Sequence, residues 1–258
     1  GTFKKVIKQP YGMVVVSGPT GSGKSTSLYA ALKEIKSERT NITTVEDPVE
    51  YQLDGVNQVQ VFEDIGLTFG STLRSILRQD PDVLLIGEIR DGETADIAVK
   101  FALTGHLVFS TVHANDAPGT ITRLLDIGIA PFLVGSCLNL VMAQRLVRRL
   151  CNNCKEQYTP TKQELGLVGL DPSKVPGKLY MAKGCAECRN TGYKGRLAIF
   201  EMIPMARDLR KLVFENANED EIRQASLDNG METLREAGLA RVLDGTTSIE
   251  EVLRSTVE

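Results

Sequence analysis

The chain has 258 residues, with 30 Lys and Arg against 33 Asp and Glu, so its formal net charge is −3 at pH 7. A hydrophobic content of 42% and a charged content of 24% are ordinary for a globular protein. They exclude a disordered chain, a collagen-like repeat and a coiled-coil rod. The small negative charge disfavours a protein that wraps nucleic acid, and the absence of Trp disfavours one that stacks single-stranded bases.

No apolar run approaches the roughly 20 residues needed to cross a bilayer. The basic N-terminus is not followed by the apolar stretch of a signal peptide. The sequence therefore predicts a soluble intracellular protein.

The first part of the chain alternates short apolar runs with helical patterns. We expect strands at the apolar runs 12–17, 42–45, 83–86 and 107–111, and a hairpin arm at 56–62, where apolar and polar residues roughly alternate. Helices are expected over 24–37, 72–79, 94–103, 117–127 and 131–150. Alternation of strands and helices predicts an α/β fold with a mostly parallel sheet.

The composition and the periodicity of the sequence change at Cys151. From there to about Arg196 the chain is rich in Cys, Gly, Pro and Lys and has little periodicity. A strand is expected at 197–203, and the remainder reads as acidic and helical. We therefore expect three parts: a core over 1–150, a small subdomain over 151–196, and a strand with a helical bundle over 197–258.

A glycine-rich segment follows the first expected strand and opens the first expected helix. It reads Gly18-Pro19-Thr20-Gly21-Ser22-Gly23-Lys24-Ser25, which matches the phosphate-loop pattern G-x-x-x-x-G-K-[ST] in the required context. Glycines let successive backbone N–H groups point at phosphate oxygens, and the helix N-terminus adds partial positive charge. Lys24 would reach the β- and γ-phosphates and Ser25 would ligate Mg²⁺. Thr26 completes the expected nucleotide-binding set.

Hydrolysis of a bound nucleotide also needs an oriented water molecule and a second ligand for Mg²⁺. Two acidic clusters could supply them. The first, 46–50, follows the strand 42–45 and ends at Glu50. The second, 87–91, follows the strand 83–86 and contains Glu88 and Arg90. Position 87 is Gly where the usual Walker B pattern has Asp. Each cluster could be a solvated turn, but each ends an apolar strand at the edge where α/β sheets bind ligands.

The chain has 2 His, and they flank the expected strand 107–111. His113 would follow its carboxyl end, at the same edge as the phosphate loop, where it could donate to a γ-phosphate. His106 precedes the strand and is either an accessory group or a satisfied turn or core residue. Arg90 is a second possible accessory group.

Four cysteines form two Cys-x2-Cys pairs, Cys151 with Cys154 and Cys185 with Cys188. Four thiolates so spaced predict a closed tetrahedral Zn²⁺ site that stabilises a segment poor in apolar periodicity. Two disulfides or free thiols are the alternatives, and disulfides are rare in cytosolic proteins. Cys137 stands alone in an apolar stretch and is expected in the core.

Four stretches of the chain resemble motifs of the secretion ATPases. In chain order, the Walker A, Asp, Walker B and His boxes are matched by the phosphate loop, 44–50, 80–91 and 104–113. This superfamily drives type II secretion and type IV pilus assembly. The resemblance implies a RecA-like ATPase core and a homo-hexameric ring. It also implies that Glu50 activates the attacking water and that Glu88 lies near Mg²⁺. A preceding N-terminal domain, whose arginines complete the nucleotide site, belongs to the same resemblance.

The tetracysteine element favours assembly and secretion motors over retraction motors, which lack it in this family. By the resemblance we expect a Mg²⁺-dependent ATPase in the cytoplasm, peripheral at the inner membrane through a platform protein, and without a nucleic-acid partner. Two alternatives remain open. One is a RecA-like nucleic-acid motor, for which the sequence offers no basic strand-binding loop; the other is a nucleotide-gated scaffold without significant turnover.

Overall fold

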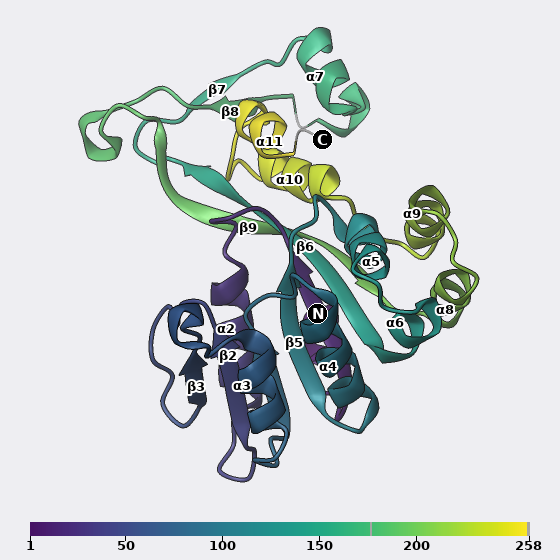
Figure 1. Ribbon diagram of the computed structural model, residues 1–258. Coiled ribbons are helices and arrows are strands. Elements are labelled where there is room, and N and C mark those ends of the chain that lie inside the picture. The colour runs from purple at the N-terminus through teal and green to yellow at the C-terminus, as the bar shows by residue number, and fades with distance from the viewer. Residues whose placement is uncertain (176, 257–258) are drawn as a thin grey trace. The chain divides into compact units, whose positions relative to one another are not determined.

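The computed structural model describes residues 1–175 and 177–256 (Figure 1). Its contacts divide the chain into two compact units. Unit 1 comprises Gly1–Ala143 and Met202–Met231, and unit 2 comprises Gln144–Glu201 and Glu232–Glu258. The three segments expected from the sequence remain a proposal about domain organisation.

Unit 1 is an α/β structure. Its strands are β1 (Gly12–Ser17), β2 (Ile42–Glu46), β3 (Asn57–Gln60), β4 (Val83–Ile86), β5 (Leu107–Val112) and the first part of β6 (Leu138–Leu150). Its helices are α1 (Thr2–Val6), α2 (Lys24–Ile35), the short 3₁₀ helix η1 (Glu63–Ile65), α3 (Phe69–Ile76), α4 (Gly92–Leu103), α5 (Ala117–Asp126), α6 (Pro131–Cys137), α8 (Arg207–Phe214) and α9 (Glu219–Asp228).

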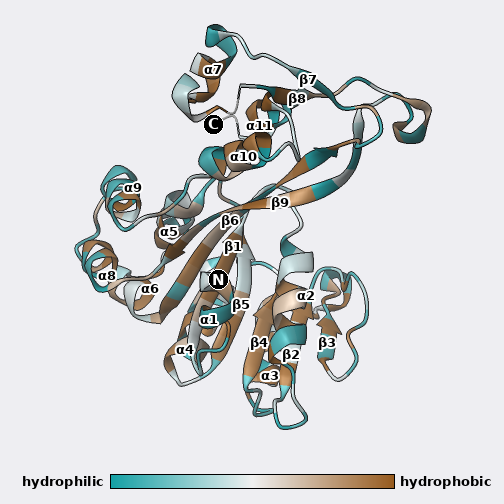
Figure 2. Ribbon diagram, turned by 180° about the vertical axis from the view of Figure 1, so that it is seen from behind, coloured by the Kyte–Doolittle hydropathy of each residue, from teal (hydrophilic) through white to brown (hydrophobic). Residues whose placement is uncertain are grey.

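The main sheet has the strand order β3-β2-β4-β5-β1-β6-β9, where β9 spans Tyr193–Pro204. Every pairing from β3 through β6 is parallel. Helices α3 and α4 face the viewer in Figure 1, and α2 lies on the opposite face, toward the viewer in Figure 2. Because both faces are covered, β1, β4 and β5 are buried along their whole length, as parallel sheets require. The expected α/β class with a mostly parallel sheet is confirmed.

Two sequence-based expectations about secondary structure are wrong. The stretch 131–150 is not one helix: α6 ends at Cys137 and the 13-residue strand β6 follows. Strand β6 pairs with β1 as far as Ser17 and Ala143. The backbone hydrogen bonds of this pairing decide the structure of the segment, although its apolar residues have the spacing of a helix. The segment 56–62 is not a hairpin arm, because β3 runs parallel to β2, and parallel neighbours need a crossover connection.

Unit 2 holds the remainder of β6, most of β9 and a smaller two-stranded sheet. Strands β7 (Glu156–Tyr158) and β8 (Leu179–Met181) pair antiparallel. The helices are α7 (Lys162–Val168), the 3₁₀ helices η2 (Pro172–Lys174) and η3 (Ala186–Cys188), α10 (Leu234–Leu243) and α11 (Ile249–Ser255). Its hydrophobic core is contributed by α7, β8, α10 and α11, and includes Leu165, Leu179, Val242 and Val252. No helix among the described residues is long and apolar enough to cross a bilayer.

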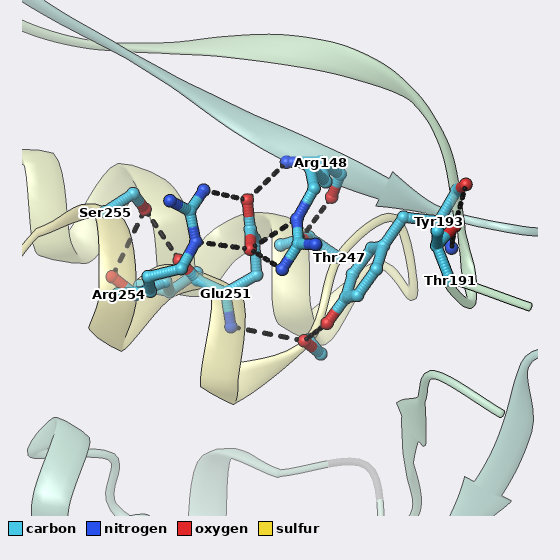
Figure 3. Close-up of polar contacts among 9 residues, drawn as sticks. Arg148, Thr191, Tyr193, Thr247, Glu251, Arg254 and Ser255 are labelled. Carbon is cyan, nitrogen blue, oxygen red and sulfur yellow. Dashed lines mark hydrogen bonds and ion pairs between the residues drawn. The ribbon is translucent and has the colours of Figure 1, made fainter. Parts of the chain in front are cut away.

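A buried carboxylate ties the last helix of unit 2 to strand β6. Glu251 is 0% exposed and accepts hydrogen bonds from the backbone and guanidinium of Arg148 and from the guanidinium of Arg254, all between 2.6 and 2.9 Å (Figure 3). The Arg148 guanidinium also lies over the Tyr193 ring, 4.1 Å from its centroid. Burial would raise the pKa of Glu251, but the hydrogen bonds from Arg254 and Arg148 lower it to about 2.

We predict that Glu251→Gln lowers the stability of unit 2 by about 1–3 kcal/mol, because a neutral amide replaces the buried carboxylate that accepts from two guanidinium groups. The side chains of Arg148 and Arg254 are 41% and 58% exposed, so water solvates part of the charge that loses its partner. The folded pKa of about 2 lies below the ordinary 4.5, so this stabilisation is present above about pH 4.5 and is lost as the pH falls toward 2. Urea unfolding followed by circular dichroism at neutral and acidic pH measures both effects.

The control for this experiment is Glu250→Gln, since Glu250 is the exposed neighbour of Glu251. Equal unfolding midpoints for the two variants at neutral pH would contradict the role given to Glu251.

Candidate functional site

The carboxyl ends of neighbouring parallel strands place the sequence motifs along one edge of the sheet in unit 1. Ser17 at the end of β1 is in register with Val112 at the end of β5, and Ile86 at the end of β4 is in register with Val45 of β2. The phosphate loop, both acidic clusters and His113 therefore leave the sheet at the same edge. Ligands of open parallel sheets bind at this edge.

The phosphate loop joins β1 to α2 through glycines in unusual conformations. Gly18, Gly21 and Gly23 have positive φ angles of 143°, 78° and 88°, which residues with a Cβ rarely adopt. A Cβ built on Gly21 would meet no atom within 4 Å, so the loop leaves room beside its backbone. The Lys24 ammonium donates to the carbonyl oxygens of Gly18 at 2.7 Å and Pro19 at 3.1 Å.

The other expected members of the nucleotide set lie in or next to this loop. Thr20 and Ser22 belong to the loop itself, and Ser25 and Thr26 lie in the first turn of α2. Backbone N–H groups, a helix N-terminus and an ammonium together make a donor set that fits a phosphate chain.

Glu88 follows β4 and contacts both Arg90 and His113. Its carboxylate forms an ion pair with Arg90, and its Oε2 lies 3.2 Å from His113 Nε2. The pKa of His113 lies below its usual value because of partial burial and then because of the positive charges of Lys24, Arg90 and Arg123. The effect of Lys24 reflects the proximity of His113 to the phosphate loop. Because a carboxylate only accepts hydrogen bonds, a hydrogen bond at this contact requires a proton on His113 Nε2.

The structure explains why Gly occupies position 87. The Gly87 N–H donates to the Val45 carbonyl at 2.7 Å, and a Cβ at Gly87 would lie 3.3 Å from both the Glu46 Cα and the Val45 oxygen. On the other side, the Thr111 hydroxyl donates to the Gly87 carbonyl at 2.7 Å. A side chain at this position would require the backbone of β2 to yield by a few tenths of an ångström, and the carboxylate is supplied by the next residue, Glu88.

The segment after β2 carries Glu50, which is exposed. The Glu50 N–H donates to Tyr29 Oη at 3.3 Å, and the neighbouring Val49 N–H donates to Gln60 Oε1 at 3.2 Å. Sequence reasoning missed both partners. A usable signal existed for Gln60 but not for Tyr29: Gln60 stands two residues after Gln58, and residues two apart lie on the same face of a strand.

His106 lies at the opposite end of β5 from His113. Its ring stacks on Phe101 with centroids 4.1 Å apart, and its Nδ1 lies 3.2 Å from Thr104 Oγ1 and 3.3 Å from the Phe101 carbonyl. The 6 residues of β5 separate it from the site edge by about 20 Å at the usual rise per residue. Of the residues singled out from the sequence in unit 1, the structure does not bring His106 to the edge that carries the phosphate loop.

The four cysteines of the Cys-x2-Cys pairs form a cluster within unit 2. Their sulfur atoms all lie within 4.8 Å of one another, with 3.7 Å from Cys185 to Cys188, 3.8 Å from Cys154 to Cys188 and 4.0 Å from Cys151 to Cys185. None of the four is in a disulfide. Sulfurs about 3.8 Å apart match the edges of a tetrahedron with metal–sulfur distances of about 2.3 Å, so this donor set fits Zn²⁺.

Backbone groups support the cysteine cluster. The N–H groups of Cys185 and Gly192 each donate to Cys188 Sγ at 3.2 Å. Gly192 has a φ of 75°, and a Cβ there would lie 2.5 Å from Ala182 Cβ, so the turn requires glycine. Cys137 is buried in α6 of unit 1, as expected of a core residue.

Comparison with known proteins gives these features a family. The model of the Type II/IV secretion system protein family matches residues 1–254. The type IV pilus assembly ATPase PilB of Myxococcus xanthus is 53% identical over 256 residues, and the type II secretion system protein E of Pseudomonas aeruginosa is 49% identical over 254 residues. Both matches cover 98% of this chain but only 45% and 50% of the relatives. The chain thus spans about half the length of the curated relatives it matches.

Solved structures agree with this family. The crystal structure of the pilus retraction motor PilT with bound ADP matches with a TM-score of 0.72 and 28% identity, over 97% of this chain and 62% of that chain. The ATPase DotB of Legionella pneumophila matches with a TM-score of 0.69 over 97% of this chain and 61% of that chain. At 21% identity, the likeness to DotB supports the fold alone.

We predict that Gly87→Ala destabilises the protein by about 1–3 kcal/mol, the usual cost of an added methyl group that pushes tightly packed neighbours apart. The reason is the approach of β2 described above. Thermal unfolding measures the loss. Gly166→Ala in helix α7 is the control, because a Cβ there meets no atom within 4 Å and alanine favours a helix over glycine, so this variant should not lose stability. A Gly87→Ala protein that unfolds at or above the temperature of the unmodified protein would contradict the role given to the close approach of β2.

Proposed function

We propose, from the premise that this chain belongs to the Type II/IV secretion system protein family, that it hydrolyses ATP to power type IV pilus assembly or type II protein secretion. The observation that carries the proposal is the gathering of Lys24, Glu88, His113 and the Glu50 segment at one edge of a parallel sheet. Relatives of both kinds match at similar identity, 53% and 49%, so identity favours neither process.

In the proposed site the phosphate loop binds ATP, with its backbone N–H groups directed at the phosphate oxygens. Lys24 exchanges its two carbonyl partners for the β- and γ-phosphates. Ser25 and Glu88 would hold Mg²⁺, since hydroxyl and carboxylate oxygens are the ligands this ion prefers. The ion would neutralise negative charge on the β- and γ-phosphates. Arg90 and His113 contact the Glu88 carboxylate and would limit its movement in this role.

Glu50 is the proposed base of the reaction. An exposed carboxylate at the sheet edge can orient a water molecule and accept its proton as the water oxygen bonds to the γ-phosphorus. The bond from that phosphorus to the β–γ bridging oxygen breaks, and the products are ADP and inorganic phosphate. His113 lies near Lys24 and contacts Glu88. Loss of the γ-phosphate would therefore change the electrostatic surroundings of both His113 and Glu88.

The assembled form and its surroundings are part of the same proposal. We infer that the active protein is a homo-hexamer in the cytoplasm, held at the inner membrane by a platform protein that converts subunit movement into extrusion of pilin or pseudopilin. The support is the naming of relatives as pilus assembly and secretion ATPases.

We also propose that the cysteine cluster of unit 2 binds a structural Zn²⁺. With four thiolates as ligands, no coordination position is left for substrate. The ion would stabilise a segment in which the buried cluster consists of the cysteines themselves.

We predict that Glu50→Gln in the full-length, assembled protein lowers kcat by about 100-fold or more, the usual contribution of general base catalysis. The KM for ATP should change little, because binding rests on the phosphate loop. A steady-state assay of phosphate release measures both constants. Glu38→Gln, a change at an exposed residue outside the motifs, is the control. Unchanged turnover in Glu50→Gln would overturn the assignment of the base.

For the metal, we predict about one Zn²⁺ per chain in the purified protein, as a closed four-thiolate site requires. Elemental analysis of the purified protein checks this. Cys188→Ser should lose most of the zinc and lower the stability of unit 2, whereas Cys137→Ala should keep it. A zinc content below about half an equivalent in the unmodified protein would refute the structural zinc site.

A further inference from the structure

A buried polar network joins the helix of the phosphate loop to the end of strand β2. Tyr29 of α2 is 1% exposed and Glu46, the last residue of β2, is 4% exposed. The Tyr29 hydroxyl donates a hydrogen bond to Glu46 Oε2, and the Thr44 hydroxyl donates to Glu46 Oε1 at 2.5 Å. The Gln58 amide reaches both Tyr29 Oη and Glu46 Oε1 at 3.3 Å. Each of these donors to Glu46 is a neutral group.

The same network holds the turn that carries Glu50. The Tyr29 oxygen accepts a hydrogen bond from the Glu50 N–H at 3.3 Å. Gln58 accepts from the Leu53 N–H at 2.6 Å and donates to the Tyr51 carbonyl at 3.2 Å. The backbone of the turn is thus fixed at Glu50 itself and again one and three residues later.

The direction of the hydrogen bonds at Tyr29 follows from its surroundings. Burial, and then the bond to Glu46, raise the pKa of Tyr29 well above its usual value, so the hydroxyl keeps its proton and donates it to Glu46. The lone pairs of the oxygen are then available to the Glu50 N–H and the Gln58 amide. Glu46 therefore orients the hydroxyl so that it can accept from Glu50.

Tyr29 also belongs to the same helix as the phosphate-binding lysine. It follows Lys24, the first residue of α2, by five positions. A helix of this length behaves as one stiff element, so the Tyr29 hydroxyl keeps a fixed place relative to the phosphate loop. The hydroxyl is a direct link between the part of the site that binds phosphate and the segment that carries the proposed base.

We propose that Tyr29 is a positioning residue for hydrolysis: its hydroxyl, oriented by Glu46, sets the place of the Glu50 backbone relative to the phosphate loop. This inference rests on the proposed function, in which Glu50 activates the attacking water. Small errors in the position of a reacting group lower rates strongly, by about 100-fold for a misplacement of about 1 Å.

Tyr29→Phe tests the inference in the full-length, assembled protein, because it removes the hydroxyl and keeps the ring that packs edge-on against Tyr51 at 4.7 Å. We expect kcat to fall about tenfold or more while the KM for ATP stays within about twofold. Tyr51→Phe is the matched control and should leave both constants unchanged, since the residue is 46% exposed and its hydroxyl takes no part in the network described above.

A double variant separates positioning from a general loss of structure. If Tyr29 acts through Glu50, then Tyr29→Phe lowers the residual kcat of Glu50→Gln by less than about twofold, because coupled residues are not additive. An equal loss in both backgrounds, or an unchanged kcat in Tyr29→Phe alone, overturns the inference. If Glu50→Gln alone leaves kcat unchanged, the proposed base is what fails.

A second variant covers the case in which Tyr29→Phe does not fold. Gln58→Met removes the amide that bonds Tyr29, Glu46 and the turn, and it does so on β3, the edge strand, where the side chain is half-buried. We expect the same pattern, a lower kcat with a KM for ATP within about twofold. A loss confined to KM would contradict the inference.

Discussion

The parallel backbone pairing of β1, β5, β4 and β2 is the constraint on which the site depends. The pairing continues beyond the strand ends: the Gly87 N–H bonds the Val45 carbonyl at 2.7 Å, and the Ile89 N–H bonds the Thr111 carbonyl at 2.9 Å. The segment with Glu88 is therefore held by backbone hydrogen bonds to β2 on one side and to β5 on the other. In the strand order, β4 and the Glu88 segment that follows it lie between β1, which leads into the phosphate loop, and β2, which leads to Glu50.

Burying a carboxylate is costly unless hydrogen-bond donors surround it. The two buried carboxylates Glu251 and Glu46 have different kinds of donor. In unit 2, Glu251 faces two guanidinium groups, which lower its pKa to about 2 and fix α11 on β6. In unit 1, Glu46 receives hydrogen bonds from the neutral groups of Tyr29, Thr44 and Gln58. The first arrangement stabilises unit 2, whereas the second orients a hydroxyl next to the proposed site.

The sequence was sufficient for features that depend on residue type and local spacing. The phosphate loop, the Cys-x2-Cys pairs and the buried strands β1, β4 and β5 could be recognised because glycine, cysteine and continuous apolar runs have few alternative uses. Strand β6 could not, since an apolar run that is buried has the same appearance in a helix and in a strand. Only its pairing with β1 decides between the two.

The polar network around Tyr29 was also beyond sequence reasoning. Tyr29, Glu46 and Gln58 lie 12 to 29 positions apart, and each has an ordinary local context. The family resemblance pointed to Glu50, but what holds Glu50 in place depends on long-range contacts. Gly87 is a similar case. The sequence shows that it departs from the usual Walker B pattern, but the close approach of β2 at this position depends on long-range contacts.

The two histidines allow the most direct test of the central claim, that the motifs at this sheet edge bind the phosphates of a nucleotide. Imidazole NMR signals of His106 and His113 can be followed as Mg²⁺ and a non-hydrolysable ATP analogue are added to the full-length protein. The account predicts that the His113 signal shifts while that of His106, at the other end of β5, does not. A His113 signal that stays in place at saturating nucleotide, or a shift confined to His106, would contradict it.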